Sequence, residues 1–597
     1  MNIQSVLFPK DNICNVEELY FHREGDCVLF DGYFNLFYLE KHHKYCDIRD
    51  LTLELEVKGL RKLVLMHNDS EVKEEMFENR PISGRERIRA FKENRVIIEK
   101  DTATLLQKVS ITVPYDKCKL GVIWFKVQVD PRFADGSWIL RGNYECAPVD
   151  EHVKIGVNIC TFKREKYVLR NMKSLTSWAE EHEDVAQKLH VFIVDNGNTL
   201  SSDEEFQKVI NKTDYIEVIP NANTGGTGGF SRGMTKAMEK RDELLLSHLL
   251  MMDDDAVFDP DLFIRLHGFL SLLRPEYKEI TVGGALMRED FKYVQHAAGE
   301  WFTKFMVIND HPLVDMRDYR NCTAEWMTDA SEVKDRYGAW WCCCYNMSAI
   351  TGENLPLPIF VHHDDIQFGM KQAERGIVFL NGICVWHQGF ELVFPGVKQY
   401  YNMRNTMITM NMFEPEYFKK NWKYWAIRRY TGVMINYRYG ECDLIYRAIV
   451  DYTKGREWLL SSDPEALHKE VTSEYKAAGD FVSLENVEFD PEERTDVLNQ
   501  VDEISDFKNV DELREYYNHD KYSGPVLKEL TVNGYFLPGL KRIKVITPLD
   551  SPWECYRRRK VLLYEPGSGK GLIVNRSYKE LFKGIGRIIR ICFMKTV

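Results

Sequence analysis

One stretch of this 597-residue chain constrains its fold more than any other: an apolar run that stops abruptly at three aspartates. Ser247 to Pro260 reads S-H-L-L-M-M-D-D-D-A-V-F-D-P. A short apolar run is typical of a strand buried on both faces of a parallel sheet, and ligands bind where such strands end. Because alternate side chains of an extended end share a direction, Asp253 and Asp255 can point at one spot. Two such carboxylates suit Mg²⁺ or Mn²⁺ with a diphosphate, and the alternative is a solvated acidic turn.

The chain around this stretch alternates strands with helices. Buried strands are expected at 154–161, 190–194 and 215–220, and helices at 166–181 and 231–241. This βαβαβ order predicts a doubly wound sheet that carries functional groups at its strand ends.

A glycine-rich segment lies between the third strand and the second helix. Five glycines fall within the nine residues from Gly225 to Gly233. Glycines let the backbone approach a ligand closely, and a helix amino terminus behind them favours anions, so a loop that binds an anionic ligand is expected. A dinucleotide fingerprint would follow the first strand, so NAD binding is not expected. Gly567 to Gly571 lacks the spacing of a phosphate loop and is discounted.

A second pair of carboxylates follows about 110 residues later, at Asp364 and Asp365. They precede a helical pattern from Ile366 to Arg375. A carboxylate at a helix start is commonly a cap, but two in succession exceed what a cap needs. His387 follows a short apolar strand, where an imidazole can complete a metal site with the first cluster.

The length and the local patterns predict several parts. A chain of this size exceeds what one hydrophobic core supports. Residues 1–150 hold short β-rich runs between turn signals, which predicts a β-sandwich. Its aromatic side chains are expected to fill the core, with stacking on sugars as the alternative. Residues 151–400 form the α/β part, 401–540 a helical region and 541–597 a basic segment.

Composition indicates the cellular setting. No apolar run approaches the roughly 20 residues that span a bilayer, and the start of the chain lacks a signal-peptide pattern, so we expect a cytoplasmic protein. The 14 cysteines include no C-x-x-C pair and suit buried free thiols. The whole chain carries a net charge of −12, yet residues 541–597 hold 14 Lys and Arg against 4 Asp and Glu. This basic, amphipathic end predicts contact with an anionic membrane surface, and docking on the acidic body is the alternative.

Seven motifs occur together in the order and approximate spacing of one known family: C-T-F-K-R (160–164), V-D-N-G (194–197), N-T-G-G-T-G-G-F (223–230), M-D-D-D (252–255), W-W (340–341), H-D-D (363–365) and W-H (386–387). Together they resemble the inverting family 2 glycosyltransferases, and most of all the galactofuranosyltransferases that polymerise galactan. The resemblance implies an α/β fold of the GT-A type, a doubly wound mixed sheet, between an N-terminal β-sandwich and a C-terminal helical region.

The resemblance also implies a role for each matching residue. Mn²⁺ or Mg²⁺ would be bound by Asp253, Asp255 and His387, and Asp365 would be the general base with Asp364 ordering the acceptor. The donor would be held by Thr161, Arg164, Asp195, Asn223, Gly225, Gly226, Gly228, Gly229 and Asp254. The acceptor would be bordered by Trp340, Trp341, His296, Glu300 and His363. Core packing is the alternative for one of the two tryptophans. His363 stands where members of the family tend to carry tryptophan, which leaves the acceptor open.

The implied reaction moves galactofuranose from UDP-galactofuranose onto a lipid-linked or polymeric glycan at the inner face of the cell membrane. No nucleic-acid partner is expected, and a homo-oligomer is left open. One alternative is a family 2 transferase with a pyranose or rhamnose donor. A glycoside hydrolase using Asp364 or Asp365 would leave the three aspartates and the glycine-rich segment unexplained. A noncatalytic carbohydrate-binding protein is the third alternative.

Overall fold

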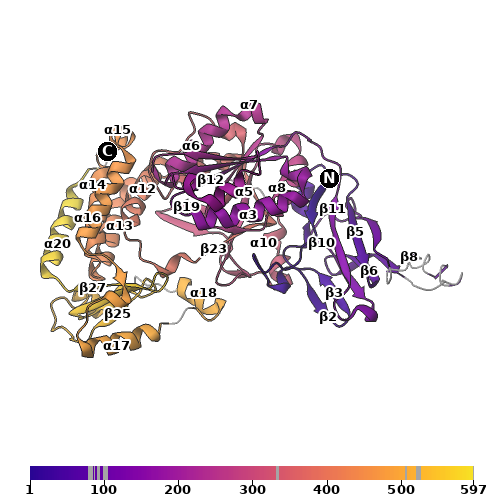
Figure 1. Cartoon of the computed structure of the whole chain (residues 1–597). Helices are drawn as coiled ribbons and strands as arrows, with labels where there is room; N and C mark the ends of the chain where they lie inside the picture. The colour runs from indigo at the N-terminus through magenta and orange to yellow at the C-terminus, as the bar shows by residue number, and fades with distance from the viewer. Residues whose placement is uncertain are drawn as a thin grey trace.

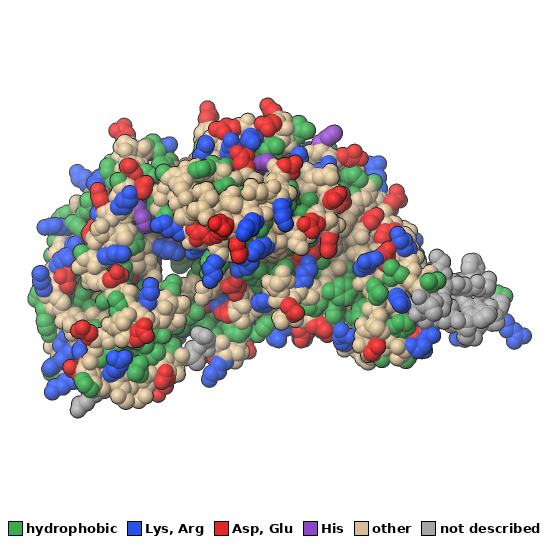
Figure 2. Space-filling view, in the orientation of Figure 1, with side chains coloured by type: hydrophobic (Ala, Val, Ile, Leu, Met, Phe, Trp, Pro, Cys, Tyr) green, Lys and Arg blue, Asp and Glu red, His purple; other side chains and the backbone are tan. Residues whose placement is uncertain are grey.

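The computed structural model describes residues 1–77, 85, 88–89, 95–98, 105–330, 335–504, 507–518 and 526–595. Three parts lie in a row: the N-terminal strands at one end, an α/β domain in the middle and a helical region at the other end (Figure 1). The space-filling view is hollowed between the middle part and the helical region, and charged side chains of both signs gather beside this hollow (Figure 2).

The N-terminal part is built from two sheets, which are antiparallel except for the parallel pair β7 and β8. One has the order β1-β11-β5-β9, and the other runs β2-β3-β10-β6-β7-β8, with β4 also paired to β10. The outer strands of the second sheet are β2 (His22–Glu24), β4 (Phe37–Tyr38), β7 (Ser70–Phe77) and β8 (Arg95–Ile98). The strands of the first sheet are β1 (Asn2–Ser5), β11 (Ile139–Glu145), β5 (Thr52–Lys58) and β9 (Gln107–Thr112). The central strands of the second are β3 (Cys27–Phe30), β10 (Val122–Val129) and β6 (Leu60–His67). Tyr33, Phe34 and Trp124 are buried, so these aromatics fill the core as the sequence predicts.

The α/β domain contains one ten-stranded mixed sheet, as predicted. Its order is β14-β13-β12-β15-β22-β17-β18-β21, with β23 paired to β17 and β16 paired to β23. Three of these strands are short: β16 (Val257–Phe258), β18 (Val294–Ala297) and β21 (Val314–Asp315). The first four strands in sequence run parallel to one another, with β12 between β13 and β15, whereas β15 and β22 are antiparallel. The strands that carry the site are β12 (Ile155–Thr161), β13 (Leu189–Asp195), β14 (Ile216–Pro220), β15 (His248–Asp253), β17 (Thr281–Arg288), β22 (Cys342–Asn346) and β23 (Ile377–His387). The order of the strands reverses between β12 and β15, because β13 and β14 follow on one side of β12 and β15 lies on the other, and ligands bind at such a point.

The glycine-rich segment differs from its prediction. It is not a loop: α6 (Gly225–Glu239) begins at the first of these glycines. A Cβ at Gly229 would lie 2.1 Å from the Cys160 sulfur, and one at Gly233 would lie 1.9 Å from the Asn158 side-chain oxygen. Both neighbours belong to β12, so these glycines let the helix pack closely on the first strand of the sheet.

The sandwich and the α/β domain share one hydrophobic core. Buried side chains run without interruption from Ile3 in β1 to Trp386 in β23. Helix α8 (Leu262–Ser271) packs against β1, where a Cβ on Gly268 would lie 2.8 Å from the Ile3 Cα. Lys10 forms ion pairs with Asp259 and Asp261 at 2.8 and 2.7 Å. These contacts fix the sandwich against the strand that carries the three aspartates.

The C-terminal region is helical with one correction. Its helices are α12 (Lys398–Phe413), α13 (Pro415–Ile435), α14 (Tyr439–Tyr452), α15 (Gly455–Ser461), α16 (Pro464–Ala477), α17 (Pro491–Asp502), α18 (Val510–Asn518), α19 (Val526–Leu530) and α20 (Tyr578–Phe593). A four-stranded sheet in the order β24-β27-β26-β25 was not predicted. Its members are β24 (Val482–Ser483), β25 (Lys544–Ile546), β26 (Lys560–Glu565) and β27 (Lys570–Asn575). Gly567 to Gly569 form the turn between β26 and β27, which agrees with discounting a phosphate loop.

The last helix packs on the body and also exposes an apolar stripe. Leu581, Gly584 and Ile591 of α20 are buried against α13 and α14. On its outer face Phe582, Ile585, Ile589 and Phe593 are exposed. Among the described residues, no helix combines the length and the apolar character needed to cross a bilayer.

Candidate active site

The first carboxylate cluster lies at the carboxyl ends of four strands. Asp253 ends β15, and Thr161, Asp195 and His387 end β12, β13 and β23. The two-residue strand β16 (Val257–Phe258) pairs with β23 so that Val257 faces Trp386. This pairing brings the chain after the aspartates back to the end of β23. As a result the His387 Nε2 lies 3.5 Å from the Asp255 carboxylate.

Side chains of α3 (Glu165–Glu181) hydrogen-bond to the backbone of the turn that carries the aspartates. Asn171 donates from its side-chain amide to the carbonyls of Asp254 and Ala256, both at 3.0 Å. Arg170 donates to the carbonyl of Asp255 at 2.9 Å. Because these bonds satisfy the backbone, the aspartate side chains remain available for a ligand.

Electrostatics separates the three aspartates. Burial and the neighbouring Asp255 and Asp254 raise the pKa of Asp253 well above its usual range. Burial also raises the pKa of Asp254, to about 6. For Asp255 the hydrogen bond from His387 and the charge of Arg164 overcome burial and lower the pKa to about 2. Arg164 contacts Asp255 directly and lies 3.5 Å from Asp254. Of the three aspartates, Asp255 therefore keeps its negative charge to the lowest pH.

The donor set suits a divalent cation. Two carboxylates and an imidazole are the ligand types that Mg²⁺ and Mn²⁺ accept. The His387 Nδ1 lies 2.6 Å from the carbonyl oxygen of Gln388, which can only accept a hydrogen bond, so Nδ1 carries a proton and Nε2 is the ring nitrogen that faces Asp255 and that would bind a cation after losing its own proton. Within the described parts of the chain, no three His, Cys, Asp or Glu side chains already stand close enough together to hold an ion. Arg164 occupies the side of Asp255 toward Asp254 instead.

The second carboxylate pair opens α11 (Asp364–Gln372). Asp364 accepts a hydrogen bond from the Thr227 hydroxyl at 3.1 Å, so α6 fixes its position. Asp365 accepts from the backbone N–H of Ile366 at 2.7 Å. Burial, followed by the charge of Asp364, raises the pKa of Asp365 to about 7. A carboxylate with such a pKa can take up a proton near neutral pH.

The loop before α11 is strained and firmly held. Phe360, His362 and His363 all have positive φ angles, between 64° and 76°. Such conformations cost roughly 1–3 kcal/mol each and persist where the surroundings impose them. The Asn405 amide of α12 donates to the carbonyls of Ile359, Val361 and His362, at 3.1, 2.8 and 3.0 Å. The loop thus presents Asp364 and Asp365 in one arrangement.

The two clusters belong to one site. The charge of Asp364 contributes to raising the pKa of Asp253, which places the pairs within electrostatic reach of each other. Glu300 is buried, and the charge of Asp365 adds to burial in raising its pKa well above normal. The carboxylates of β15, α11 and β19 (Glu300–Thr303) therefore surround one region.

The expected acceptor residues lie in different environments. Trp340 is only 3% exposed and packs between Phe230 and Phe368, so it belongs to the core. Trp341 is half-buried and donates to the carbonyl of Gly284. His363 is turned away from the site, because its ring lies 3.1 and 3.0 Å from the hydroxyls of Thr409 and Thr406 on α12. An acceptor-binding role for Trp340 and His363 does not fit these positions. Glu300 remains beside Asp365, and His296 lies near His387.

The expected donor residues are near the strand ends, and several already have structural partners. Asp195 accepts from the backbone N–H groups of Gly197 and Leu200, at 3.0 and 2.9 Å, and thereby shapes the turn after β13. Asn223 accepts from the Gly225 N–H at 3.3 Å. The buried Thr161 hydroxyl lies beside the Asp254 carboxylate, and a hydrogen bond from it acts against the effect of burial on the Asp254 pKa. Gly226 lies 3.9 Å, measured from an added Cβ, from the Asp364 carboxylate, whereas Gly228 and Gly229 pack against protein atoms.

Sequence reasoning missed two groups near the site. Lys398 begins α12, and its pKa is lowered by burial and by the charge of Arg164, while Asp255 and Asp253 act in the opposite direction. Phe390 is stacked on the His387 ring with centroids 4.8 Å apart. Both residues follow the W-H motif within 11 positions, so inspection of that segment for a cation and an aromatic ring was the available signal.

Comparison with known proteins identifies the class. The family model described as Glycosyl transferase family 2 matches residues 157–303, which include β12 to β15 and the three aspartates. The chain therefore carries a glycosyl transferase family 2 domain with the GT-A type of α/β fold, and it is a glycosyltransferase. This finding favours the transferase over the hydrolase and the binding protein.

Two curated relatives are more particular. The chain is 23% identical over 479 residues to "Galactofuranosyltransferase GlfT2" of Mycobacterium tuberculosis, covering 74% of this chain and 67% of the relative. It is 24% identical over 324 residues to "Galactofuranosyltransferase GlfT2" of Mycolicibacterium smegmatis, covering 48% of this chain and 47% of the relative. The homology therefore links this transferase to the galactofuranosyltransferases.

Among solved structures, the chain is similar to the mannosyltransferase PcManGT from Pyrobaculum calidifontis (11% identity, 56% of this chain and 87% of that chain, TM-score 0.29). It is also similar to GalNAc-T7 (13% identity, 48% of this chain and 52% of that chain, TM-score 0.33).

Proposed function

We propose that the chain transfers galactofuranose from UDP-galactofuranose to a hydroxyl of a growing glycan, with inversion and with a divalent cation. The observation that carries this proposal is the meeting of two carboxylate clusters at one site, in which Asp255 and Asp365 have opposite character. In the cluster after β15, Asp255 keeps its negative charge beside a histidine. In the other, Asp365 has a pKa of about 7. The donor sugar rests on the similarity to the two galactofuranosyltransferases.

The leaving-group side of the reaction is assigned to the β15 cluster. A divalent cation bound by Asp253, Asp255 and His387 would offset the negative charge that develops on the departing diphosphate. Arg164 and Lys398 bring two further positive charges to the same carboxylates. We assign both to the donor diphosphate, since guanidinium and ammonium groups are common phosphate ligands.

The acceptor side is assigned to the start of α11. Asp365 takes the proton of the attacking hydroxyl as the bond to the anomeric carbon forms, and the bond to the diphosphate breaks on the opposite face. Such general base catalysis contributes roughly 10²–10⁴-fold. Asp364, fixed by Thr227, orders the acceptor beside it. Inversion follows because a single displacement occurs on the face opposite the leaving group.

The acceptor is proposed to be a lipid-linked or polymeric glycan at the cytoplasmic face of the cell membrane. The exposed stripe of α20 consists of Phe582, Ile585, Ile589 and Phe593, and Arg590 is exposed on the same helix. An apolar stripe with basic neighbours binds anionic bilayer surfaces.

Release of UDP tests the proposal directly. Purified protein is incubated with UDP-galactofuranose, UDP-galactopyranose or a dTDP-sugar, with and without Mn²⁺ and an alkyl galactofuranoside acceptor. The proposal predicts UDP release and a longer glycan only with UDP-galactofuranose, cation and acceptor together. Equal turnover of the pyranose donor would overturn the donor assignment, and turnover in excess chelator would overturn the cation.

A further inference from the structure

Helix α18 lies within residues 401–540, which the sequence predicts to be a separate helical region, yet it packs against the α/β domain. Figure 1 shows it lying next to β23, between the α/β domain and the C-terminal sheet. Its buried residues Val510 and Leu513 pack with Val294 of β18 (Val294–Ala297) and with Leu313. The helix therefore has an apolar attachment to the α/β domain.

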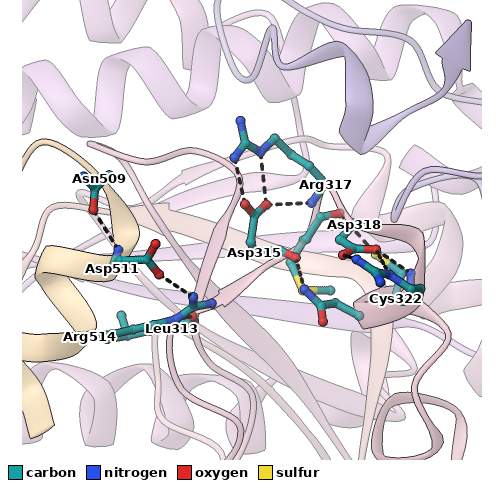
Figure 3. Close-up of polar contacts among 11 residues, drawn as sticks. Leu313, Asp315, Arg317, Asp318, Cys322, Asn509, Asp511 and Arg514 are labelled. Atoms are coloured by element: carbon teal, nitrogen blue, oxygen red, sulfur yellow. Dashed lines mark hydrogen bonds and ion pairs between the residues drawn. The ribbon is translucent and has the colours of Figure 1, made fainter.

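Polar contacts fix the position of α18. Asn509 caps its start by accepting from the N–H groups of Asp511 and Glu512, both at 3.0 Å. Arg514 donates to the carbonyl of Leu313 and to Asp511, both at 3.0 Å. Figure 3 shows these bonds beside the Asp315–Arg317 pair of the neighbouring segment. Hydrogen bonds as well as apolar contacts therefore hold α18 on the α/β domain.

The position of α18 directs Tyr517 at the active site. Tyr517 follows Val510 by seven residues and Leu513 by four, so it shares their face of the helix. Its hydroxyl donates to the Glu391 carboxylate at 3.0 Å. Glu391 in turn pairs with the buried Arg288 at 2.6 Å. These bonds hold the tyrosine ring in place although 44% of its surface is exposed.

A row of rings connects Tyr517 to the proposed cation site. His387 stacks on Phe390, and Phe390 meets His296 edge to face at a centroid distance of 6.0 Å. His296 meets Tyr517 edge to face at 5.8 Å. Two of these rings are accessible to solvent, because Phe390 is 52% exposed and Tyr517 is 44% exposed. Exposed, fixed aromatic rings beside hydrogen-bonding groups are the surfaces on which sugar rings stack.

We propose that Phe390 and Tyr517, with the buried His296 ring packed between them, form a shelf that binds a sugar ring of the acceptor glycan, with α18 supplying its outer wall. The inference rests on the proposed function for the kind of ligand, whereas the shelf itself is defined by its contacts. The shelf begins at His387 and leads away from it, so it holds a sugar further along the acceptor than the reacting one. Tyr517 is a specificity-determining residue that favours longer acceptors.

Binding of an acceptor probe tests the shelf independently of turnover. The probes are alkyl galactofuranosides with one and with three galactofuranose units, titrated by calorimetry into the full chain with UDP and Mn²⁺. We expect Tyr517→Ala to weaken binding of the three-unit probe about tenfold, a typical loss for one stacked ring, and to change the one-unit probe less than about twofold. Tyr517→Phe, which keeps the ring, should bind nearly as the wild type does.

Two further variants separate stacking from damage to the fold. Arg514→Ala removes the bond to the Leu313 carbonyl and should reproduce Tyr517→Ala without touching the ring. Tyr424→Ala, at an exposed tyrosine of α13, is the matched control and should leave both probes unchanged. UDP affinity should be equal in all variants and reports an intact donor site.

The outcomes distinguish this inference from the proposed function. Wild-type binding of the three-unit probe by Tyr517→Ala and Arg514→Ala would overturn the shelf, as would failure of the wild type to prefer the three-unit probe. A wild type that binds the probe but releases no UDP would retain the shelf and overturn the transfer reaction.

Discussion

The two carboxylate clusters of the site differ in what surrounds them. The cluster after β15 is met by cationic groups, Arg164 and His387, and the pKa of Asp255 is lowered to about 2. The pair at the start of α11 has no ion pair among the contacts described, and burial raises the pKa of Asp365 to about 7. Asp255 and Asp365 thus acquire opposite properties. The surroundings, and not the residue type, therefore determine that one carboxylate stays charged and that the other can accept a proton.

The largest effect is expected from Asp255→Asn. This change removes a carboxylate that both His387 and Arg164 contact. Loss of several kcal/mol of leaving-group stabilisation predicts a fall in transfer of about a thousandfold or more, with the fold intact. Steady-state UDP release is the measurement, and Asp242→Asn, at an exposed aspartate of α7 (Arg241–Leu244), is the matched control. Full activity of Asp255→Asn would refute the role of the cluster.

A smaller loss is expected from Asp365→Asn. Without a general base, transfer should fall at least about a hundredfold, while a cap alone would cost about 1 kcal/mol of stability and little rate. Asp364→Asn should instead raise the acceptor concentration required more than it lowers the maximal rate. If Asp365→Asn kept near-normal turnover, the base would have to be another group, and Glu300 is the next candidate.

The rate of transfer and the stability of the fold should depend on pH in opposite directions. Transfer should rise several-fold as the pH increases through about 7, because Asp365 must lose its proton to act as the base. Stability should move the other way. The pKa of Asp365 is raised from 3.8, so between about pH 4 and pH 7 the folded state binds more protons than the unfolded state and loses stability as the pH rises.

Thermal unfolding checks this sign. Asp365→Asn has no charge to bury, so it should melt at a higher temperature than the wild type at pH 8, and the difference should shrink toward pH 5. Asp255→Asn should not show this gain, since the pKa of Asp255 is lowered. A difference for Asp365→Asn that is equal at both pH values would contradict the raised pKa.

The smallest catalytic effect is expected far from both clusters, at the outer face of α20. Phe582→Ser with Ile589→Ser should release the protein from anionic liposomes but change transfer to a short soluble acceptor less than about twofold. Leu527→Ser, at an exposed leucine of α19, is the matched control. These substitutions are preferable to truncation before Leu572, because Leu572 pairs with Leu563 in the C-terminal sheet. Equal retention of the variant would argue that α20 serves only to pack on α13 and α14.

The sequence predicted the residues at the strand ends well, because a short apolar run is compatible with few structures other than a buried strand. The run before Asp253 and the run before His387 are both strands that end at those residues. The glycine-rich segment was mistaken for a loop, since glycine permits a loop and also permits close helix packing. Only the contacts of Gly229 with Cys160 and of Gly233 with Asn158 show that packing decides the conformation.

Other features depend on contacts between distant segments, which local patterns do not reveal. His363 points into α12 because the strained loop before α11 rotates it there. Tyr517 reaches His296 across more than 200 residues of sequence. The C-terminal sheet was missed because its strands are short, and β25 runs parallel to β26 across a connection that carries no strand signal.

Metal-dependent binding of UDP is the most direct test of the different roles assigned to the two carboxylate clusters. Calorimetric titration of UDP is performed on the wild type, Asp255→Asn and Asp365→Asn, each with Mn²⁺ and with chelator. We predict that Asp365→Asn binds UDP with wild-type affinity and the same dependence on Mn²⁺, while Asp255→Asn loses that dependence. Retention of Mn²⁺-dependent binding by Asp255→Asn, or its loss in Asp365→Asn, would contradict the assignment of the two clusters.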